Sequence, residues 1–303
     1  MELIRPNTRF DFIGKRRFTL WVSSAAILLC LGSIFFHGGL RYGVDFAGGL
    51  LIQVKFSKPV SISEVRNGLE ETGSKDATVQ AFGGENEFLI RVEKATGDLE
   101  QISKSIQASL ADRFKDKAIE IRRIELVGPK VGKDLKTKAM WAMGLAFLGI
   151  LIYVAWRFRE ISYGLGGIIA LFHDIVITFG AVSIFNIEFS LNVLAVILTI
   201  IGFSINDTIV IFDRVREDVK KLRKENLETI FNTAINECLG RTILTSGTVM
   251  MVVLILFFFG GPVIHDFTSA MIVGLISGTY STVYVASPVV LFWHNHVTLK
   301  RRK

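Results

Sequence analysis

Six long apolar runs limit what this chain can fold into more than any other feature. A helix needs about 20 residues to cross the hydrocarbon core of a bilayer, and each run is close to or above that length. The runs cover residues 18–36, 139–156, 163–185, 190–212, 242–259 and 267–293. The chain is therefore predicted to be a polytopic α-helical membrane protein with six transmembrane helices.

The first run, residues 18–36, is predicted to stay in the protein as an anchor. Lys15, Arg16 and Arg17 precede it, as basic residues precede the core of a signal peptide. A signal core has about 7–15 apolar residues and is followed by a small-x-small cleavage site. This run is longer, and no such site follows it in residues 35–38.

Basic residues orient the six predicted helices. Outside the segment 37–138, most Lys and Arg lie on one side of the spans, in residues 1–17, 157–159, 214–240 and 294–303. The short segments 186–189 and 260–266, on the other side, contain neither residue type. By the positive-inside rule, the N-terminus (1–17) and the basic C-terminus (294–303) are predicted to be cytoplasmic.

The net charge of +7 is interpreted as this orientation signal together with attraction to anionic lipid. The basic residues are not gathered on one soluble face, so no nucleic-acid partner is predicted. Cys30 lies in an apolar run and Cys238 in a charged segment, which argues against a disulfide between them.

No cofactor, metal or enzymatic centre is expected. Residues 128–134 faintly resemble a phosphate-binding loop, but the spacing is one residue short and Asp134 stands where the magnesium-binding Ser or Thr belongs. His294 and His296 lack further ligands nearby in the sequence, so a polar end to the last span is the simpler interpretation.

Residues 37–138 are predicted to form one external α+β domain between the first and second spans. Alternating apolar residues predict strands at 44–56, 77–82, 87–92 and 118–126, and helical spacing predicts helices over 62–69 and 99–110. Gly48-Gly49 interrupts the first strand, and Gly83-Gly84 is the predicted turn of a hairpin. The order is the βαββαβ arrangement of ferredoxin-like domains, which assigns no function by itself. We interpret the domain as a binding module.

Polar residues inside the spans carry most of the functional information, since an ionisable group in hydrocarbon costs at least about 2.5–3.5 kcal/mol. Asp207 and Arg214 share a helix face but are about 10 Å apart along the axis, so Asp207 is expected to find a partner on another helix. Arg241, at the start of the fifth span, is the obvious candidate. The alternative is that such charges hold helices together or only reach toward the cytoplasmic edge. Both interpretations stay open for Asp213, Arg214 and Arg241, and also for Asp174.

A carboxyl and a guanidinium that approach and separate form a switch for a proton. A poorly hydrated carboxyl takes up a proton when the arginine leaves and releases it when the arginine returns. The membrane field supplies about 2.3 kcal/mol per proton and 100 mV to drive such a cycle. Six residues are candidates for this relay: Asp207, Arg241, Asp174, Asp213, Asn206 and Thr245.

Two further patterns describe how the spans pack. Small residues repeat every four positions in the last span, which is typical of close helix packing: Ala270, Gly274, Gly278, Thr282 and Ala286. The segment 214–240 is basic and amphipathic, and is predicted to lie along the cytoplasmic membrane surface.

Four motifs together resemble the SecF branch of the SecD/SecF family. They are Tyr42–Gly49 at the start of the external domain, Ala170–Asp174, Ile201–Glu217, and Arg241-Thr242 with Thr245-Ser246. The resemblance covers nearly the whole chain. It implies a resistance–nodulation–division architecture, in which this chain supplies one six-span half and SecD the other, in a bacterial inner membrane.

The resemblance also implies a function and partners. SecF-like chains associate with SecD, the SecYEG channel and YajC, and use the proton-motive force to promote movement and release of exported polypeptides. Asp207 and Arg241 would then belong to a proton relay, and Asp45, Gly48 and Gly49 to the family motif of the external domain. A non-conducting scaffold for export partners is the alternative. A small-molecule or lipid exporter is disfavoured, because one compact external domain cannot enclose a cargo pocket.

Overall fold

A computed structural model describes residues 10–70, 77–82, 86–92, 98–158, 160–261 and 264–295. It confirms the six membrane helices that the apolar runs predict. They are α1 (Arg16–Phe36), α5 (Pro129–Arg157), α6 (Ile161–Ile184), α7 (Leu191–Lys221), α8 (Leu227–Phe259) and a last span over His265–Trp293. The last span consists of α9 (His265–Ser281), a π-helical turn (Thr282–Ala286) and α10 (Ser287–Trp293).

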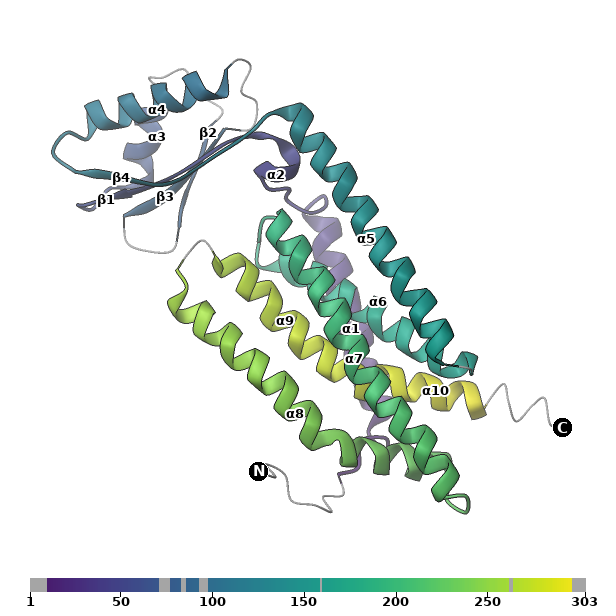
Figure 1. Cartoon of the computed structure of the whole chain (residues 1–303). Helices are drawn as coiled ribbons and strands as arrows, with labels where there is room; N and C mark the ends of the chain where they lie inside the picture. Colours follow the sequence, from purple (N-terminus) through teal and green to yellow (C-terminus); the bar gives the residue numbers. More distant parts are fainter. Residues whose placement is uncertain are drawn as a thin grey trace.

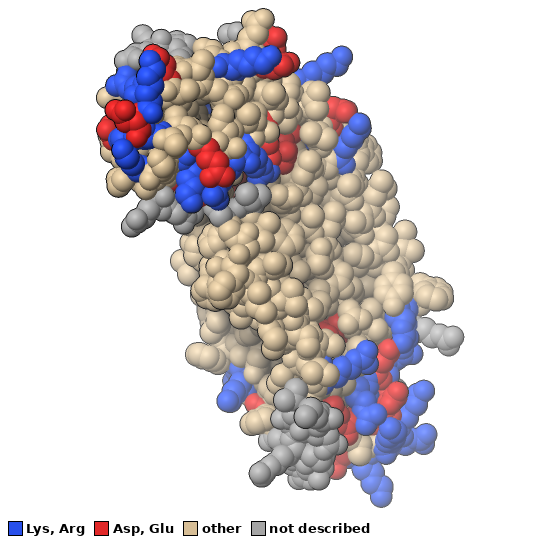
Figure 2. Space-filling view, turned by 60° about the vertical axis from the view of Figure 1, so that its left-hand side comes forward, with Lys and Arg blue, Asp and Glu red and all other residues tan. Residues whose placement is uncertain are grey.

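The helices form a bundle with a buried centre and an apolar outside. In the most apolar stretch of α6 and of α7, 56% of the residues are buried inside the bundle, and in the last span 67% are. In α5 and α8 the buried share of that stretch is only 11%. Lys, Arg, Asp and Glu gather at the two ends of the molecule, and the face between them is almost free of charge (Figure 2). This distribution fits a bundle that exposes its outer helices to lipid or to another membrane protein.

The external domain lies at one end of the bundle (Figure 1). It contains α2 (Val44–Ala47), β1 (Gly49–Phe56), α3 (Ile62–Glu70), β2 (Ala77–Ala81), β3 (Glu87–Val92), α4 (Leu99–Arg113) and β4 (Ile119–Val127). The strands are antiparallel in the order β2-β3-β1-β4. This agrees with the predicted βαββαβ arrangement. The predicted turn at Gly83-Gly84 lies outside the described residues.

The predicted strand over residues 44–56 is wrong in its first four residues, which form the short helix α2. Gly48 and Gly49 both have positive φ, +75° and +125°, so the chain reverses there before β1 begins. Phe46 does not point into the sheet core but stacks on Phe189 of the α6–α7 connection, with ring centroids 5.4 Å apart. The alternation of apolar residues before Gly48 therefore reflects packing against the bundle.

Several contacts fix the external domain to the bundle. Gly43 N–H donates to the Phe189 carbonyl at 2.9 Å, and Phe189 N–H donates to the Arg41 carbonyl at 2.7 Å. Arg91 on β3 forms an ion pair with Glu188 at 2.9 Å. The carboxylate of Asp45 accepts a hydrogen bond from the first backbone N–H of α7, that of Leu191, at 2.9 Å. Asp45 thus satisfies one of the free donors at a helix N-terminus.

A close crossing of two backbones explains the paired glycines. A Cβ at Gly48 would lie 3.0 Å from Pro129 Cα, and a Cβ at Gly132 would lie 2.9 Å from the backbone nitrogen of Gly48. The external domain therefore begins and ends at one point, where the turn before β1 contacts the first turn of α5. With φ +75° and ψ 168°, Gly48 also occupies a backbone region that is essentially restricted to glycine.

The segment 214–240 does not form an element of its own. Its first part continues α7 to Lys221, and its last part is the beginning of α8 from Leu227. Asn226 caps α8 by accepting a hydrogen bond from Thr229 N–H at 2.7 Å. That this region lies along the membrane surface remains a prediction.

Gly48→Ala is expected to destabilise the joint of the external domain by about 1–3 kcal/mol, because alanine is strained at this φ and ψ and its Cβ presses on Pro129. The measurement is thermal unfolding of the full chain in detergent, with proteolysis of the external domain as a second readout. The control is Gly144→Ala in α5, where a Cβ meets nothing within 4 Å. Equal melting temperatures for the two variants would contradict the assignment.

Candidate functional site

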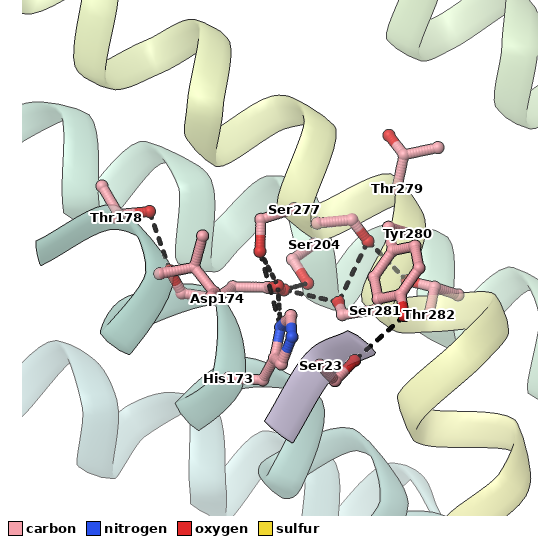
Figure 3. Close-up of polar contacts among 12 residues, drawn as sticks. Ser23, His173, Asp174, Thr178, Ser204, Ser277, Thr279, Tyr280, Ser281 and Thr282 are labelled. Atoms are coloured by element: carbon pink, nitrogen blue, oxygen red, sulfur yellow. Dashed lines mark hydrogen bonds and ion pairs between the residues drawn. The ribbon is translucent and has the colours of Figure 1, made fainter. Parts of the chain in front are cut away.

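Asp174 lies at the centre of the bundle, in the middle of α6, and is 0% exposed. Ser277 of α9 donates to Oδ1 at 2.6 Å, and Ser204 of α7 and Ser281 of α9 donate to Oδ2 at 2.6 Å each. Figure 3 shows these hydroxyls converging on the carboxylate. We call Asp174 and the three serines the serine cage. One carboxylate thus joins three helices by charge-assisted hydrogen bonds, which are stronger than those between neutral groups.

His173 extends this polar cluster to α1. Its Nδ1 lies 3.1 Å from Asp174 Oδ1, and its ring stacks on Tyr280 with centroids 6.0 Å apart. The Tyr280 hydroxyl donates to the Thr19 carbonyl at 2.7 Å and accepts from Ser23 at 3.0 Å. The other ring nitrogen, His173 Nε2, is buried and has no hydrogen-bond partner among the described residues.

Small residues let the helices approach at the serine cage. A Cβ at Gly278 would lie 3.2 Å from Ser204 Cβ, and a Cβ at Gly274 would lie 1.8 Å from Ile200 Cδ1. Gly274 and Gly278 therefore lie where α9 contacts α7. Directly after the cage, Thr282 bonds Thr208 of α7 at 3.0 Å and begins the π-helical turn. Such turns within membrane helices are frequent at functional sites.

Asp207 lies on α7, and its buried carboxylate is only partly satisfied by hydrogen bonds among the described residues. It is 4% exposed, and its Oδ2 has no hydrogen-bond partner within the described part of the chain. The hydroxyl of Ser246 and the charge of Arg241, both on α8, act on the carboxyl. Arg241 itself is exposed, and no direct ion pair joins it to Asp207 among the residues that the structure describes. Arg241 and Asp207 therefore lie near each other, as expected, but they form no ion pair in the described structure.

Asn206 and Thr245 do not contact Asp207 by hydrogen bonds in the described structure. Asn206 is exposed on the outer face of α7. Thr245 donates to the carbonyls of its own helix, those of Arg241 and Thr242, at 3.0 and 3.1 Å.

The charges at the inner end of α7 form ion pairs. Asp213 is paired with Arg157 of α5 and lies 3.6 Å from Arg216. Arg214 is paired with Glu237 of α8 and with Glu217 at 3.0 Å. These contacts join α5, α7 and α8 and favour the structural interpretation of Asp213 and Arg214.

Sequence reasoning missed the three serines of the cage. A signal was present, because Ser277 and Ser281 are four residues apart and so share one helix face. A buried carboxylate such as Asp174 needs hydrogen-bond donors, and hydroxyls on neighbouring spans are the natural candidates. Among the described residues, no group of three or more His, Cys, Asp or Glu could hold a metal ion.

Comparisons with known proteins agree with this architecture. The family model for the C-terminal part of the protein export membrane proteins SecD/SecF matches residues 106–296, and the SecD/SecF GG motif matches residues 33–60. The GG motif contains the crossing at Gly48 and Gly49.

Full-length relatives carry the name protein translocase subunit SecF. The one from Magnetococcus marinus is 44% identical over 96% of this chain and 94% of its own length. The one from Thermodesulfovibrio yellowstonii is 42% identical over 99% and 100% of the two chains. The one from Escherichia coli O157:H7 is 38% identical over 93% and 87%.

A solved structure has the same fold over almost the whole chain. The crystal structure of SecDF from Thermus thermophilus, described as a translocon-associated membrane protein, superposes with a TM-score of 0.85 at 34% identity. The match covers 97% of this chain and 40% of that chain. This chain therefore spans about 40% of the length of the SecDF protein that it resembles.

The fold defines a multi-pass membrane protein with one α+β domain inserted after its first span, and the family match assigns it to the protein-export class. The chain belongs to the SecD/SecF family, in which it matches the SecF subunits of protein translocase.

Ser277→Ala is expected to destabilise the full chain by about 1.5–3 kcal/mol, because it removes one hydrogen bond from a buried charged acceptor. The measurement is the melting temperature of the protein in lipid nanodiscs. Ser269→Ala on the same helix is the control, since the Ser269 hydroxyl bonds only the His265 carbonyl. Identical melting temperatures would show that the serine cage does not stabilise the bundle.

Proposed function

We propose that this chain is the SecF-type half of a complex with SecD that uses the proton-motive force to promote protein translocation. The observation that carries the proposal is Asp207. It is a membrane-embedded carboxyl with one oxygen unpartnered among the described residues, and a guanidinium acts on it from a neighbouring helix. A buried charge of this kind requires a counter-charge or a proton.

In one state of the cycle, Arg241 supplies the counter-charge of the ionised Asp207. In the other state, a proton on Asp207 takes the place of this counter-charge. When the guanidinium approaches, the ionised form of Asp207 is stabilised and its proton leaves. When the guanidinium withdraws, the isolated carboxylate in a poorly hydrated site takes up a proton at Oδ2. Because Arg241 is exposed and lies in the same half of the membrane, its long side chain can move between these positions without any change of fold.

The surface beside Asp207 supports a membrane partner. Thr199, Gly202 and Asn206 are small or polar residues that are exposed on the membrane-spanning part of α7. Small and polar residues favour helix association over contact with lipid tails. SecD is the partner we propose for this face, since the matching solved chains are named SecDF and are more than twice as long as this chain.

The remaining partners and the location follow from family membership and from the charge pattern. We propose association with the SecYEG channel and YajC in a bacterial inner membrane, with the sheet domain outside and both termini in the cytoplasm. The external domain would lie beside that of SecD and handle the translocating polypeptide. Its firm attachment to the N-terminus of α7 supports a transfer of motion from the span that carries Asp207.

Asp207→Asn is expected to abolish the gradient-dependent part of translocation while the chain still copurifies with SecD, because asparagine is similar in size but cannot exchange a proton. The measurement is transport of a secretory protein into inner-membrane vesicles with and without a proton gradient. Thr248→Ala on α8, the helix that carries Arg241, is the control, since the exposed Thr248 hydroxyl bonds the Thr245 carbonyl of its own helix. If the Asp207→Asn variant showed full gradient-dependent transport, Asp207 would be excluded as a member of the proton relay.

The scaffold alternative rests on the tight contact of α9 with α7 and makes the opposite prediction. It requires that Asp207→Asn remains active while Gly274→Leu does not, because a leucine at 274 would displace Ile200 and separate the two helices. Ile276→Leu, at a position 58% exposed on α9, is the matched control. The same vesicle assay, combined with copurification of SecD, decides between the two functions.

A further inference from the structure

The serine cage contains a buried acid–base pair that the relay at Asp207 does not use. Each oxygen of Asp174 accepts two hydrogen bonds, with Ser277 and His173 Nδ1 at Oδ1 and with Ser204 and Ser281 at Oδ2. The O···O distances of 2.6 Å are those of hydroxyls that donate to an ionised carboxylate. The three serine hydroxyls donate to the carboxyl, so a proton on Asp174 would displace one of these bonds. This geometry favours the carboxylate form.

The same contact favours one tautomer of His173. An ionised Asp174 Oδ1 can only accept, so we assign the imidazole hydrogen to Nδ1, to which Ser277 Oγ is also 3.5 Å away. This tautomer leaves Nε2 as the ring position that gains or loses a proton. His173 is 5% exposed, and its Nε2 is among the buried polar atoms without a partner in the described structure. A polar atom in this state is rare in proteins and calls for a physical reason.

The unpartnered Nε2 of His173 can be explained by the charge of Asp174, a buried carboxylate at the centre of the bundle. No Lys or Arg forms an ion pair with Asp174 among the residues that the structure describes. The imidazole is the group in contact with the carboxylate that can become positive. A proton at Nε2 turns a net charge of −1 into a neutral pair, which removes most of the cost of the buried charge.

Among the described residues, few other titratable side chains lie close to the His173 imidazole. Within the described residues, the titratable side chains in contact with the imidazole are Asp174 on α6 and Tyr280 on α9, and Tyr284 in the π-helical turn contacts Tyr280 in turn. From α1 it is Ser23 and the Thr19 carbonyl that reach the cluster, and both bind the Tyr280 hydroxyl. Tyr280 faces His173 with its ring, at an interplanar angle of 27°, and so favours a positive charge on the imidazole.

We propose that His173 Nε2 is a second proton-binding site of this chain, with Asp174 as its permanently ionised counter-ion. In the step that binds the proton, the Nε2 lone pair accepts it and no other bond is formed or broken. The Nδ1–H bond to Asp174 stays in place, and the three serines keep the carboxylate in position. The site is separate from Asp207 and does not depend on the relay proposed for it.

Histidine nitrogen NMR on the full chain in lipid bilayers tests the site directly. The chain has five histidines, and a His173→Gln sample identifies the His173 signals by difference. At high pH we expect the neutral ring with hydrogen on Nδ1 and none on Nε2. As the pH falls from 9 to 5, we expect Nε2 to become protonated while Nδ1 keeps its hydrogen.

Two variants separate the roles of the neighbours. Asp174→Asn removes the counter-ion and is expected to lower the midpoint of the His173 titration by at least one pH unit, a tenfold loss of proton affinity. Thr178→Val is the matched control and should leave the midpoint unchanged, because the buried Thr178 hydroxyl bonds only the backbone carbonyl of Asp174.

The wild-type spectra alone can overturn the proposal. Hydrogen on Nε2 in the neutral ring, or a His173 that does not titrate between pH 5 and 9, would exclude Nε2 as the proton site. An unchanged midpoint in Asp174→Asn would exclude Asp174 as its counter-ion. Asp207→Asn is expected to leave the His173 titration in place, so failure of the proposed relay and failure of this site give different results.

Discussion

The hydrogen bonding of one buried carboxylate is the interaction on which the rest of the bundle depends. Asp174 cannot reach water, so the protein must solvate it with its own groups. It does so with hydroxyls from α7 and α9, which forces those helices to meet α6 at one level. Gly278 opens the space that this meeting needs. The need of Asp174 for hydrogen-bond donors therefore constrains how the three most buried spans are arranged.

The polar groups of the membrane region fall into three environments with different consequences. Asp174 is surrounded by hydrogen-bonding groups of the protein. Asp207 is buried, and one of its oxygens has no hydrogen-bond partner among the described residues. Asp213 forms an ion pair with Arg157 of α5 in the C-terminal part of α7. The second environment combines a high cost of charge with an incomplete set of partners, and the proposed relay is therefore placed at Asp207.

The parts of the structure that follow from local pattern could be predicted from the sequence, and the parts that follow from long-range contact could not. Six spans are set by length and hydropathy, and the order of strands and helices by periodicity. The apolar alternation at Val44–Ala47 predicts a strand, but the segment is a helix, because its apolar residues serve contact with Phe189, which is distant in sequence. The roles of Ser204, Ser277 and Ser281 depend on their contact with Asp174, and serine is common in membrane helices without such a partner.

The crossing at Gly48 and Pro129 has a mechanical consequence. Both chain connections of the external domain meet at this crossing, so a displacement of one presses on the other. Arg91 adds a second contact beside the joint, since it pairs with Glu188 on the loop before α7 and also donates to the Tyr42 carbonyl. Because Asp45 next to the crossing also binds the first backbone N–H of α7, a shift of the span that carries Asp207 would reach the sheet domain without an intervening linker.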